Sequence, residues 1–280
     1  MQRLCSSAAT YKQPSSQGKR KSTGLHVRLG GFVTLNHCRR TLAAVDEPMR
    51  PLSYAGYRFP PEIIQHAIWL YLRFTLSFRD VEELLAERGI DVSHETIRRW
   101  VAVFGPMIAR RLRAMRPKPH TTWHLDEMFV SIGGKRMYLW RAVDAEGEVL
   151  DCLVQSRRNK RAALRLMRKL IRKYRMVPAT FVTDRLPSYA AAKAELPLPI
   201  AHERGLRQNN RAESSHVPVR RRERKMQRFR SAGSAQRFLS AHASVYNTFN
   251  ICRHLITSAT KRRFRAEAFE AWRAAVGVAA

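Results

Sequence analysis

The chain has 280 residues, with 52 Lys or Arg against 22 Asp or Glu, and a formal net charge of +30. Such an excess of positive charge predicts a polyanionic partner, and nucleic acid is the leading candidate because neutralising phosphates releases counterions. No apolar run approaches the ~20 residues that span a bilayer, which argues against a membrane protein.

The first region, residues 1–56, is predicted to be a disordered extension, since "SSAATYKQPSSQGKRKSTG" has no apolar period. We interpret residues 1–48 as a mis-assigned start with Met49 as the natural first residue, and a basic arm that contacts DNA is the alternative. Removing these residues takes away 8 basic and 2 acidic side chains, so 44 basic and 20 acidic residues leave a net charge of +24. The expectation of a nucleic-acid partner therefore does not depend on this region.

The four cysteines are too widely spaced for a zinc site or a disulfide framework, and the first thirty residues lack the apolar stretch of a secretory signal. Both observations favour a reducing, cytoplasmic location. The cysteines are Cys5, Cys38, Cys152 and Cys252.

Residues 57–112 are predicted to form an all-α, helix-turn-helix DNA-binding domain. Three helices are expected: "EIIQHAIWLYLRF" after two prolines, "SFRDVEELLAERG" with Ser77 as N-cap, and "VSHETIRRWVAVFG", which begins at Ser93 and stops at Gly105-Pro106. The last two are joined through "GIDV", which matches a helix-turn-helix, and a plain three-helix bundle is the alternative. The side chains expected in the DNA groove are His94, Glu95, Arg98 and Arg99.

Residues 120–275 are predicted to form an α/β domain with a mixed sheet. "TWHLDEMFVSI", a Gly-Gly turn and "KRMYLWRAV" indicate a hairpin, and "EVLDCLVQS" adds a third strand. The helix "KRAALRLMRKLIRKY", the short strand "ATFVTD", the helix "SYAAAKAEL" and a helical tail follow. A three-stranded meander followed by helix, strand and helix is typical of a mixed α/β sheet.

Three acidic residues occupy apolar or structurally specific positions. Asp126 lies within a hydrophobic strand, Asp184 ends the strand "TFVTD", and Glu213 falls in a helix that should start near Asn209. Because unpaired buried carboxylates cost several kcal/mol, a compensating cation is expected. Arginine is one candidate, and a hard divalent metal suits carboxylate-only ligands better. Two such ions, about 3.5–4 Å apart, would hold the attacking and leaving oxygens of a phosphoryl displacement.

A dense basic block follows Glu213 in "NNRAESSHVPVRRRERKMQRFR". We expect this block to hold the phosphate backbone of DNA while the carboxylates hold metal. Arg220 lies seven residues after Glu213, two turns along the same helix face, and is expected to point at the same DNA strand. The predicted DNA contacts of the segment are Asn209, Asn210, Arg211, Arg220, Arg221, Arg222, Arg224 and Lys225.

The motifs "WHLDE", "VTDRLPSY" and "NNRAESSH", followed by "RRRERKMQRFRS" and "GSAQRFLS", resemble the DDE transposases of bacterial insertion sequences. The most similar group is insertion-sequence family six, and the resemblance covers roughly residues 57–275. It implies an RNase H-like catalytic core and two Mg²⁺ ions, with Mn²⁺ as a substitute. It also implies a catalytic, metal-binding triad at Asp126, Asp184 and Glu213. The family's basic residue after the glutamate falls on Arg220, and Ser214 stands where relatives often have asparagine.

Other titratable residues near these motifs are expected to be structural. Glu127 points to the opposite side of the strand from the preceding aspartate, so we predict that it pairs with a basic side chain. Asp144 and Asp151 lie in or beside a turn, where acids are usually solvated. His202 and His216 flank the site, either as structural hydrogen-bonding residues or as substrate contacts.

The sequence thus predicts a transposase whose N-terminal helices bind terminal inverted repeats. Its triad would activate water to nick the element ends, and the freed 3′-hydroxyl would attack a target phosphodiester. Since two ends are cut and joined together, a homodimer or higher oligomer is expected on double-stranded DNA, in the cytoplasm and at the nucleoid. The alternatives are a helix-turn-helix regulator without catalysis and an RNase H-like nuclease that cuts without joining.

Overall fold

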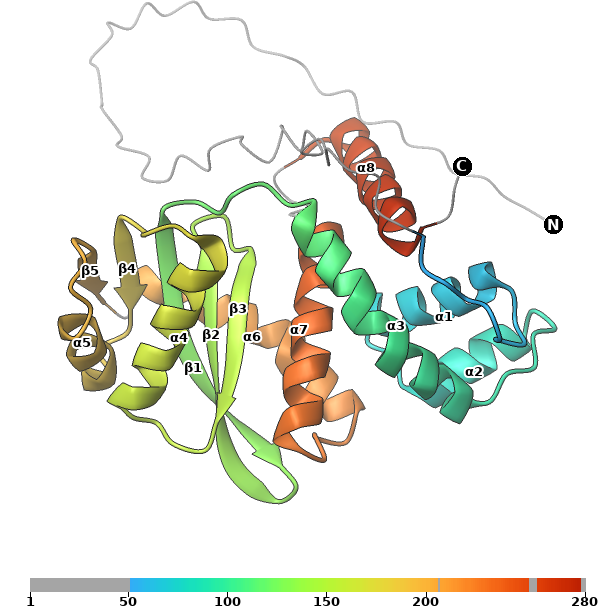
Figure 1. Cartoon of the computed structure of the whole chain (residues 1–280), viewed down its shortest axis with the longest axis horizontal. Coiled ribbons are helices and arrows are strands. Elements are labelled where there is room, and N and C mark those ends of the chain that lie inside the picture. Colours follow the sequence, from blue (N-terminus) through green and yellow to red (C-terminus); the bar gives the residue numbers. More distant parts are fainter. Residues whose placement is uncertain (1–50, 206, 252–255, 278–280) are drawn as a thin grey trace, which may run out of the picture. The chain divides into compact units, whose positions relative to one another are not determined.

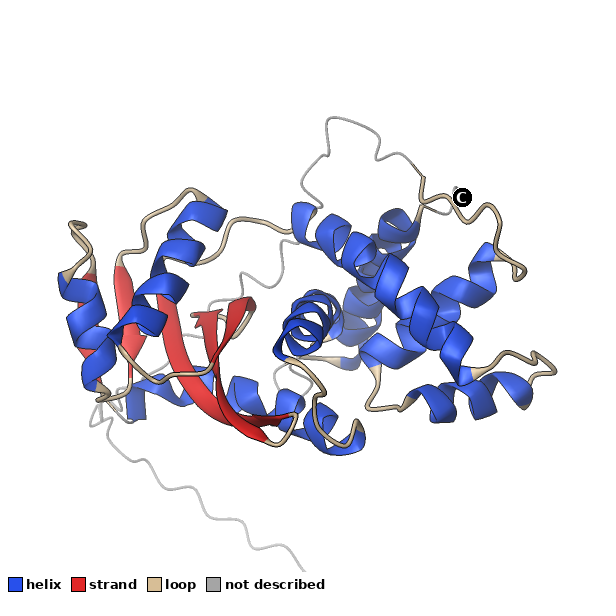
Figure 2. Ribbon diagram, turned by 60° about the horizontal axis from the view of Figure 1, so that its bottom comes forward, coloured by secondary structure: helices blue, strands red, loops and turns tan. Residues whose placement is uncertain are grey.

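The computed structural model describes residues 51–205, 207–251 and 256–277, with the side chain of residue 207 excepted. The expectations for residues 1–48 and for Cys5, Cys38 and Cys252 lie outside these ranges. Figures 1 and 2 show the elements. In chain order they are α1 (Pro61–Arg73), α2 (Phe78–Ala86), α3 (His94–Ala114), β1 (Thr122–Ile132), β2 (Lys135–Asp144), β3 (Val149–Gln155), α4 (Lys160–Tyr174), β4 (Thr180–Thr183), α5 (Pro187–Ala194), β5 (Ala201–Arg204), a 3₁₀ turn (Arg207–Asn209), α6 (Asn210–Lys225), α7 (Ala232–Phe249) and α8 (Ser258–Val276).

The first three helices confirm the expected elements, with one difference. Ser77 and Asp80 form a reciprocal capping box at the start of α2, and the Ser93 side chain caps α3. However, α3 does not stop at Gly105-Pro106 but continues to Ala114, with Pro106 inside the helix. The apolar stripe of α3 continues past the proline through buried Ile108 and Leu112. Burial of that stripe therefore outweighs the hydrogen bond that a proline removes.

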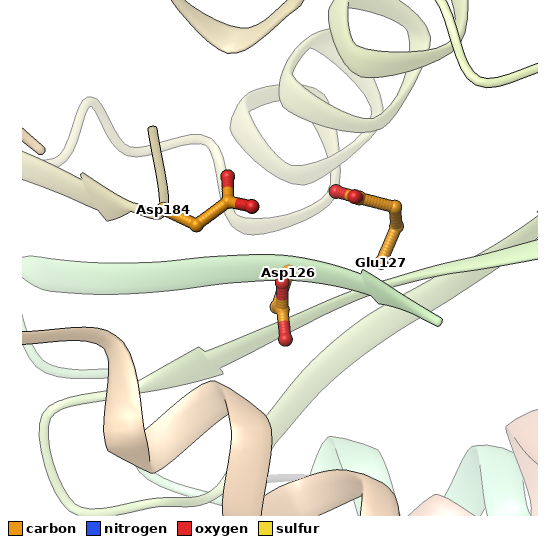
Figure 3. Close-up of side chains that lie close together, drawn as sticks. All are labelled: Asp126, Glu127 and Asp184. Carbon is orange, nitrogen blue, oxygen red and sulfur yellow. The ribbon is translucent and has the colours of Figure 1, made fainter. Parts of the chain in front are cut away.

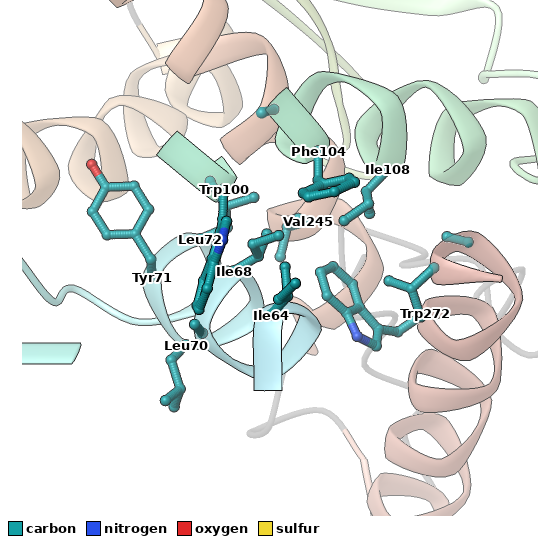
Figure 4. Packing of buried hydrophobic residues seen from close by; sticks show 14 of the residues in the cluster. Ile64, Ile68, Leu70, Tyr71, Leu72, Trp100, Phe104, Ile108, Val245 and Trp272 are labelled. Carbon is teal, nitrogen blue, oxygen red and sulfur yellow. The ribbon is translucent and has the colours of Figure 1, made fainter. Parts of the chain in front are cut away.

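The helical core combines segments that are distant in sequence. Buried residues of α1 to α3, such as Ile64, Ile68 and Trp100, form one cluster with Val245 of α7 and Trp272 of α8 (Figure 4). The helical tail therefore contributes to the core of the N-terminal helices.

The sheet has five strands in the order β3-β2-β1-β4-β5. β1 and β2 are antiparallel, as are β2 and β3, whereas β4 pairs parallel with β1 and β5. This arrangement confirms the expected mixed α/β fold and the RNase H-like core. The sequence reading missed β5, a four-residue strand in which no residue is buried. A short edge strand of polar residues lacks the apolar alternation that identifies strands.

The two faces of the sheet are covered by different helices (Figure 2). Trp123 and Leu125 of β1 pack in one cluster with α4 and α5. Met128 and Val130, which point to the other face, pack with residues of α6 and α7. Even-numbered residues of β1 therefore face α6, and odd-numbered residues face the side of α4 and α5.

Side chains of α7 hydrogen-bond the outer edge of the sheet, at β3. The Asn247 amide accepts from the Val149 N–H and donates to the Val149 carbonyl, both at 2.9 Å. The Gln236 amide accepts from the Val154 N–H and donates to the Cys152 carbonyl. These contacts satisfy backbone groups that would otherwise offer an edge for pairing with another chain. Within the described ranges, every helix is too short or too polar to cross a membrane.

Candidate active site

Asp126 and Asp184 lie side by side because β1 and β4 are parallel neighbours. Leu125 is paired with Thr183 in the register of the two strands. The next residue on each strand is the predicted aspartate, so both carboxylates lie at the same level of the sheet. Asp126 is 8% exposed, and the Asp184 carboxylate accepts a hydrogen bond from the Leu186 N–H. The structure therefore brings together two of the three predicted catalytic acids.

Glu127 is the third acid near these aspartates. One carboxylate oxygen from each of Asp126, Glu127 and Asp184 lies within 4.8 Å of the others. Figure 3 shows the Glu127 side chain on the opposite side of β1 from Asp126, as the strand alternation predicts. Glu127 also has its predicted basic partner, because Arg158 Nη2 lies 2.6 Å from Glu127 Oε1. Burial raises the pKa of Glu127, with the Asp184 charge adding to the rise, while Tyr189 and Arg158 oppose it.

Glu213 lies in the first turn of α6, is exposed, and falls outside this three-acid cluster. Its position on the helix is nevertheless informative. Asn209, Glu213, His216 and Arg220 are spaced i, i+4, i+7 and i+11, which places them on one stripe of the helix. Glu213 thus lies between two residues whose side chains contact β1.

Three hydrogen bonds fix the start of α6 against the sheet. Asn209 Nδ2 donates to the Leu125 carbonyl at 2.9 Å, and His216 Nε2 lies 2.9 Å from Asp126 Oδ2. Arg141, the cross-strand neighbour of Asp126, donates from Nε to Ser215 Oγ at 2.9 Å. These contacts hold the start of α6, which includes Glu213, beside the strand that carries Asp126, and the Glu213 side chain is exposed.

The carboxylates fit the chemistry of a divalent metal site. The cluster offers oxygen atoms only, which Mg²⁺ and similar hard cations prefer. The chain as a whole carries a net charge of +30, yet these three carboxylates lie close together, repel one another and need nearby positive charge. Arg158 contacts Glu127 and His216 contacts Asp126, both from outside the cluster. The site therefore suits a divalent cation.

Some side chains of the basic block at α6 are exposed, and others form contacts within the protein. Asn210, Arg211, Arg221 and Arg224 are exposed. Arg220 is partly exposed and pairs with Glu223 at 3.4 Å.

Asn209, Arg222 and Lys225 are engaged within the protein. Asn209 is fully buried, and Lys225 Nζ lies 2.6 Å from Asp80 Oδ2 of α2. Arg222 is 1% exposed and donates from Nη1 to the carbonyls of Phe74 and Leu76, at 2.6 and 2.8 Å. Asn209 and Arg222 therefore differ from the expectation of DNA contact, because side chains that face the core do not reach a phosphate.

The predicted recognition residues begin α3. Arg98 and Arg99 are exposed, and Arg98 forms an ion pair with Glu95 at 2.5 Å. His94 Nδ1 lies 3.0 Å from Glu82 of α2. The two arginines are thus available to a partner, whereas His94 links α2 to α3.

Other titratable residues have structural contacts. His202 Nε2 lies 2.9 Å from Thr183 Oγ1, directly before Asp184. Asp144 and Asp151 correct the expectation of solvated acids, since both are buried. Burial, with the nearby charge of Glu148, raises the pKa of Asp144 to about 6. Asp151 lies 3.0 Å from both Lys169 and Lys173, an arrangement that a one-dimensional turn pattern does not reveal.

The sequence reading missed Arg158 and Arg141. Arg158 follows the end of β3, and in the sequence it resembles any other surface cation. Its role becomes visible only from its contact with Glu127 of β1. Arg141 is fully buried mid-strand in "YLWRAV". A lone charged residue within an apolar run is a usable signal, because such a residue is rarely buried without a specific partner.

Comparisons with known proteins agree with this geometry. A family model described as a DDE domain matches residues 120–251. Two transposases of Staphylococcus aureus align over 201 residues, which is 70% of this chain and 88% of each relative. The transposase for insertion sequence-like element IS431mec, from strain Mu50, is 32% identical, and that for insertion sequence element IS257 in transposon Tn4003 is 31% identical.

Among solved structures, the simian T-cell lymphotropic virus intasome in complex with PP2A regulatory subunit B56 gamma matches 49% of this chain and 51% of that chain. The TM-score is 0.36 and the identity 14%. The curated relatives, by contrast, are matched over most of their length, and the DDE-domain match contains both adjacent aspartates. The chain therefore belongs to the DDE transposases of insertion sequences.

Proposed function

We propose that Asp126, Asp184 and Glu213 form the catalytic triad of this transposase and hold two Mg²⁺ ions, for which Mn²⁺ can substitute. The observation that carries the proposal is the parallel pairing of β1 with β4, which sets the two aspartates side by side. The stripe of α6 supports Glu213 as the third ligand, because its neighbours Asn209 and His216 both contact β1.

Each side chain then has a definite task. His216 holds the Asp126 carboxylate on the side of α6, while Arg158 neutralises Glu127 on the other side of the strand. The three proposed ligands would hold the cations, which when bound would supply Lewis acidity to the phosphodiester that is cut and joined. Exposed Arg221 and Arg224 contact the DNA backbone, and each phosphate contact contributes to the salt dependence of binding.

The exposed arginines of α3 support recognition of the terminal inverted repeats. Arg98 and Arg99 are presented near the start of the second helix of a helix-turn-helix, the part that reads base edges in this motif. Because two element ends are cut and joined together, the active form is a homodimer or a higher oligomer on DNA. Its place of action is the cytoplasm, on nucleoid DNA.

A strand-transfer assay tests this function. Double-stranded terminal-repeat DNA and a target plasmid are incubated with Mg²⁺ and either the wild type or Asp184→Asn, which keeps the side-chain shape and removes the charge. We expect nicked and joined products from the wild type, and end binding without products from Asp184→Asn. Cutting without joining would indicate a nuclease. Equal products from both proteins would refute metal-dependent chemistry at Asp184.

A further inference from the structure

The hairpin of β1 and β2 carries an exposed aromatic surface beside the acids. Phe129 is opposite Tyr138 in the register, and Ser131 is opposite Arg136. Directly opposed residues share a face of the sheet, so these four residues form one surface, which we call the hairpin platform. Phe129 is 42% exposed, although most large apolar side chains of this domain are buried.

The opposite face of the same hairpin is anchored in the core. Met128, Val130 and Ile132 pack with Phe229 and residues of α6 and α7. At the tip, the Gly133 N–H donates to the Phe229 carbonyl at 3.0 Å. The tip extends past the ends of α4 (Figure 1). The hairpin is therefore anchored through that face, while Phe129 and Arg136 are exposed on the platform face.

The platform begins next to the acidic cluster. Phe129 follows Glu127 by two residues on the same face, a separation of about 7 Å along a strand. A Glu127 oxygen lies within 4.8 Å of an Asp184 oxygen. Successive nucleotides of one strand rise by about 3.4 Å in duplex DNA, so the Phe129 ring lies within about two nucleotides of the acids.

The charge around the platform matches a nucleic-acid strand. The Arg136 guanidinium carbon lies 4.8 Å from the centre of the Phe129 ring. Glu127, on the same face of β1 as Phe129, is already paired with Arg158, and both Arg158 and its neighbour Arg157 are exposed. An exposed aromatic ring among cations is the combination that binds single-stranded nucleic acid, because the ring stacks on a base and the cations contact phosphates.

We propose that the hairpin platform binds an unpaired base of the DNA strand next to the phosphate that is cut, with the base stacked on Phe129 and the adjoining phosphate on Arg136. The proposal rests on the proposed function, because it needs DNA at the acidic cluster. It adds a requirement: the base pairs beside the cut must open before the strand reaches the acids. Ends whose flanking base pairs are already broken should therefore bind better.

The test compares two terminal-repeat duplexes, one fully paired and one mismatched at the two base pairs beside the cut. All proteins carry Asp184→Asn so that the DNA stays intact, and dissociation constants are measured by fluorescence anisotropy. The Asp184→Asn protein should favour the mismatched duplex, and adding Phe129→Ala should weaken binding of that duplex about 5- to 150-fold, equivalent to ~1–3 kcal/mol of stacking. Phe129→Trp should keep the preference.

Phe269→Ala is the matched control, because Phe269 is 37% exposed on α8 and is expected to leave the preference unchanged. The proposal is overturned if Phe129→Ala keeps the preference for the mismatched duplex or if Asp184→Asn alone shows none. A change in sedimentation with unchanged DNA preference would instead make the platform a contact between copies of the chain. Binding of the fully paired duplex tests the proposed function separately. If the protein does not bind this duplex at all, the proposed function fails, whatever the role of the platform.

Discussion

Arg222 and Arg221 are neighbours on α6, but Arg222 is buried and Arg221 is exposed. Substituting each in turn therefore distinguishes a structural role from a DNA-binding role. The Arg222 guanidinium is buried, donates two hydrogen bonds to the chain between α1 and α2, and lies 4.6 Å from the Tyr71 ring. Burial lowers its pKa, which is the sign of a desolvation cost. Arg221 is exposed.

The effect of Arg222→Met on stability follows from these contacts. Two hydrogen bonds from a charged donor are worth ~3–6 kcal/mol together. Methionine carries no charge, so the substitution also removes the desolvation cost of the buried guanidinium and offsets part of this loss. We therefore expect a net loss of ~2–4 kcal/mol in the free energy of unfolding. For a chain of this size the melting temperature should fall by about 5–15 °C. Arg221→Met should change stability by less than about 0.5 kcal/mol.

The assay measures thermal unfolding and the salt dependence of end binding for both variants. If Arg221 contacts a phosphate, Arg221→Met should reduce the slope of log affinity against log salt by about 0.9. Folded Arg222→Met should keep the slope of the wild type. The reasoning is refuted if Arg222→Met is as stable as the wild type and loses slope, because Arg222 would then contact DNA rather than the N-terminal helices.

Two further predictions concern histidines, the buried His242 and the partly buried His216. Burial, reinforced by the charges of Arg222 and Arg141, lowers the pKa of His242 to about 3. Because the unfolded chain takes up this proton below about pH 6.5 and the folded chain does not, stability is lost as the pH falls from 6.5 toward 3. By pH 5 His242 should account for ~2 kcal/mol of that loss, which denaturant titrations at pH 7 and pH 5 would detect. His242→Phe should remove this share, and an unchanged pH dependence would contradict it. His216→Ala should slow strand transfer about 10- to 100-fold by releasing Asp126, as expected for a residue that orients a metal ligand. It should also raise the Mn²⁺ concentration needed for half-maximal rate, with partial rescue by His216→Asn, and an unaltered Mn²⁺ requirement would contradict the positioning role.

Much of the fold could be predicted from sequence because local signals agreed with the tertiary structure. The Gly-Gly turn fixed the hairpin, and "TFVTD" marked a buried strand whose last residue reaches the acidic cluster. The exceptions have local causes. The pair Gly105-Pro106 predicts a helix end, but packing of Ile108 and Leu112 carries α3 beyond it.

The site was less accessible to sequence reasoning, because its contacts join segments far apart along the chain. The alternation of β1 correctly predicts a basic partner for Glu127, yet it does not identify that partner, Arg158, which lies 31 residues away. Arg222 looked like its exposed neighbours in "RRRER", and its burial depends on the packing of α6 against the N-terminal helices. The pattern of residues along one helix or strand therefore predicts which side chains face the core, but not which charged side chains pair with one another.

The choice between Glu213 and Glu127 as the third metal ligand tests the proposed triad most directly. The measurement is the yield of joined DNA product with Mg²⁺ for the wild type, Glu213→Gln and Glu127→Gln, all compared at equal end binding. We predict that Glu213→Gln gives no joined product, while Glu127→Gln retains it. Joined product from Glu213→Gln at the wild-type level, with its loss in Glu127→Gln, would contradict the triad and assign the third ligand to the strand instead of the helix.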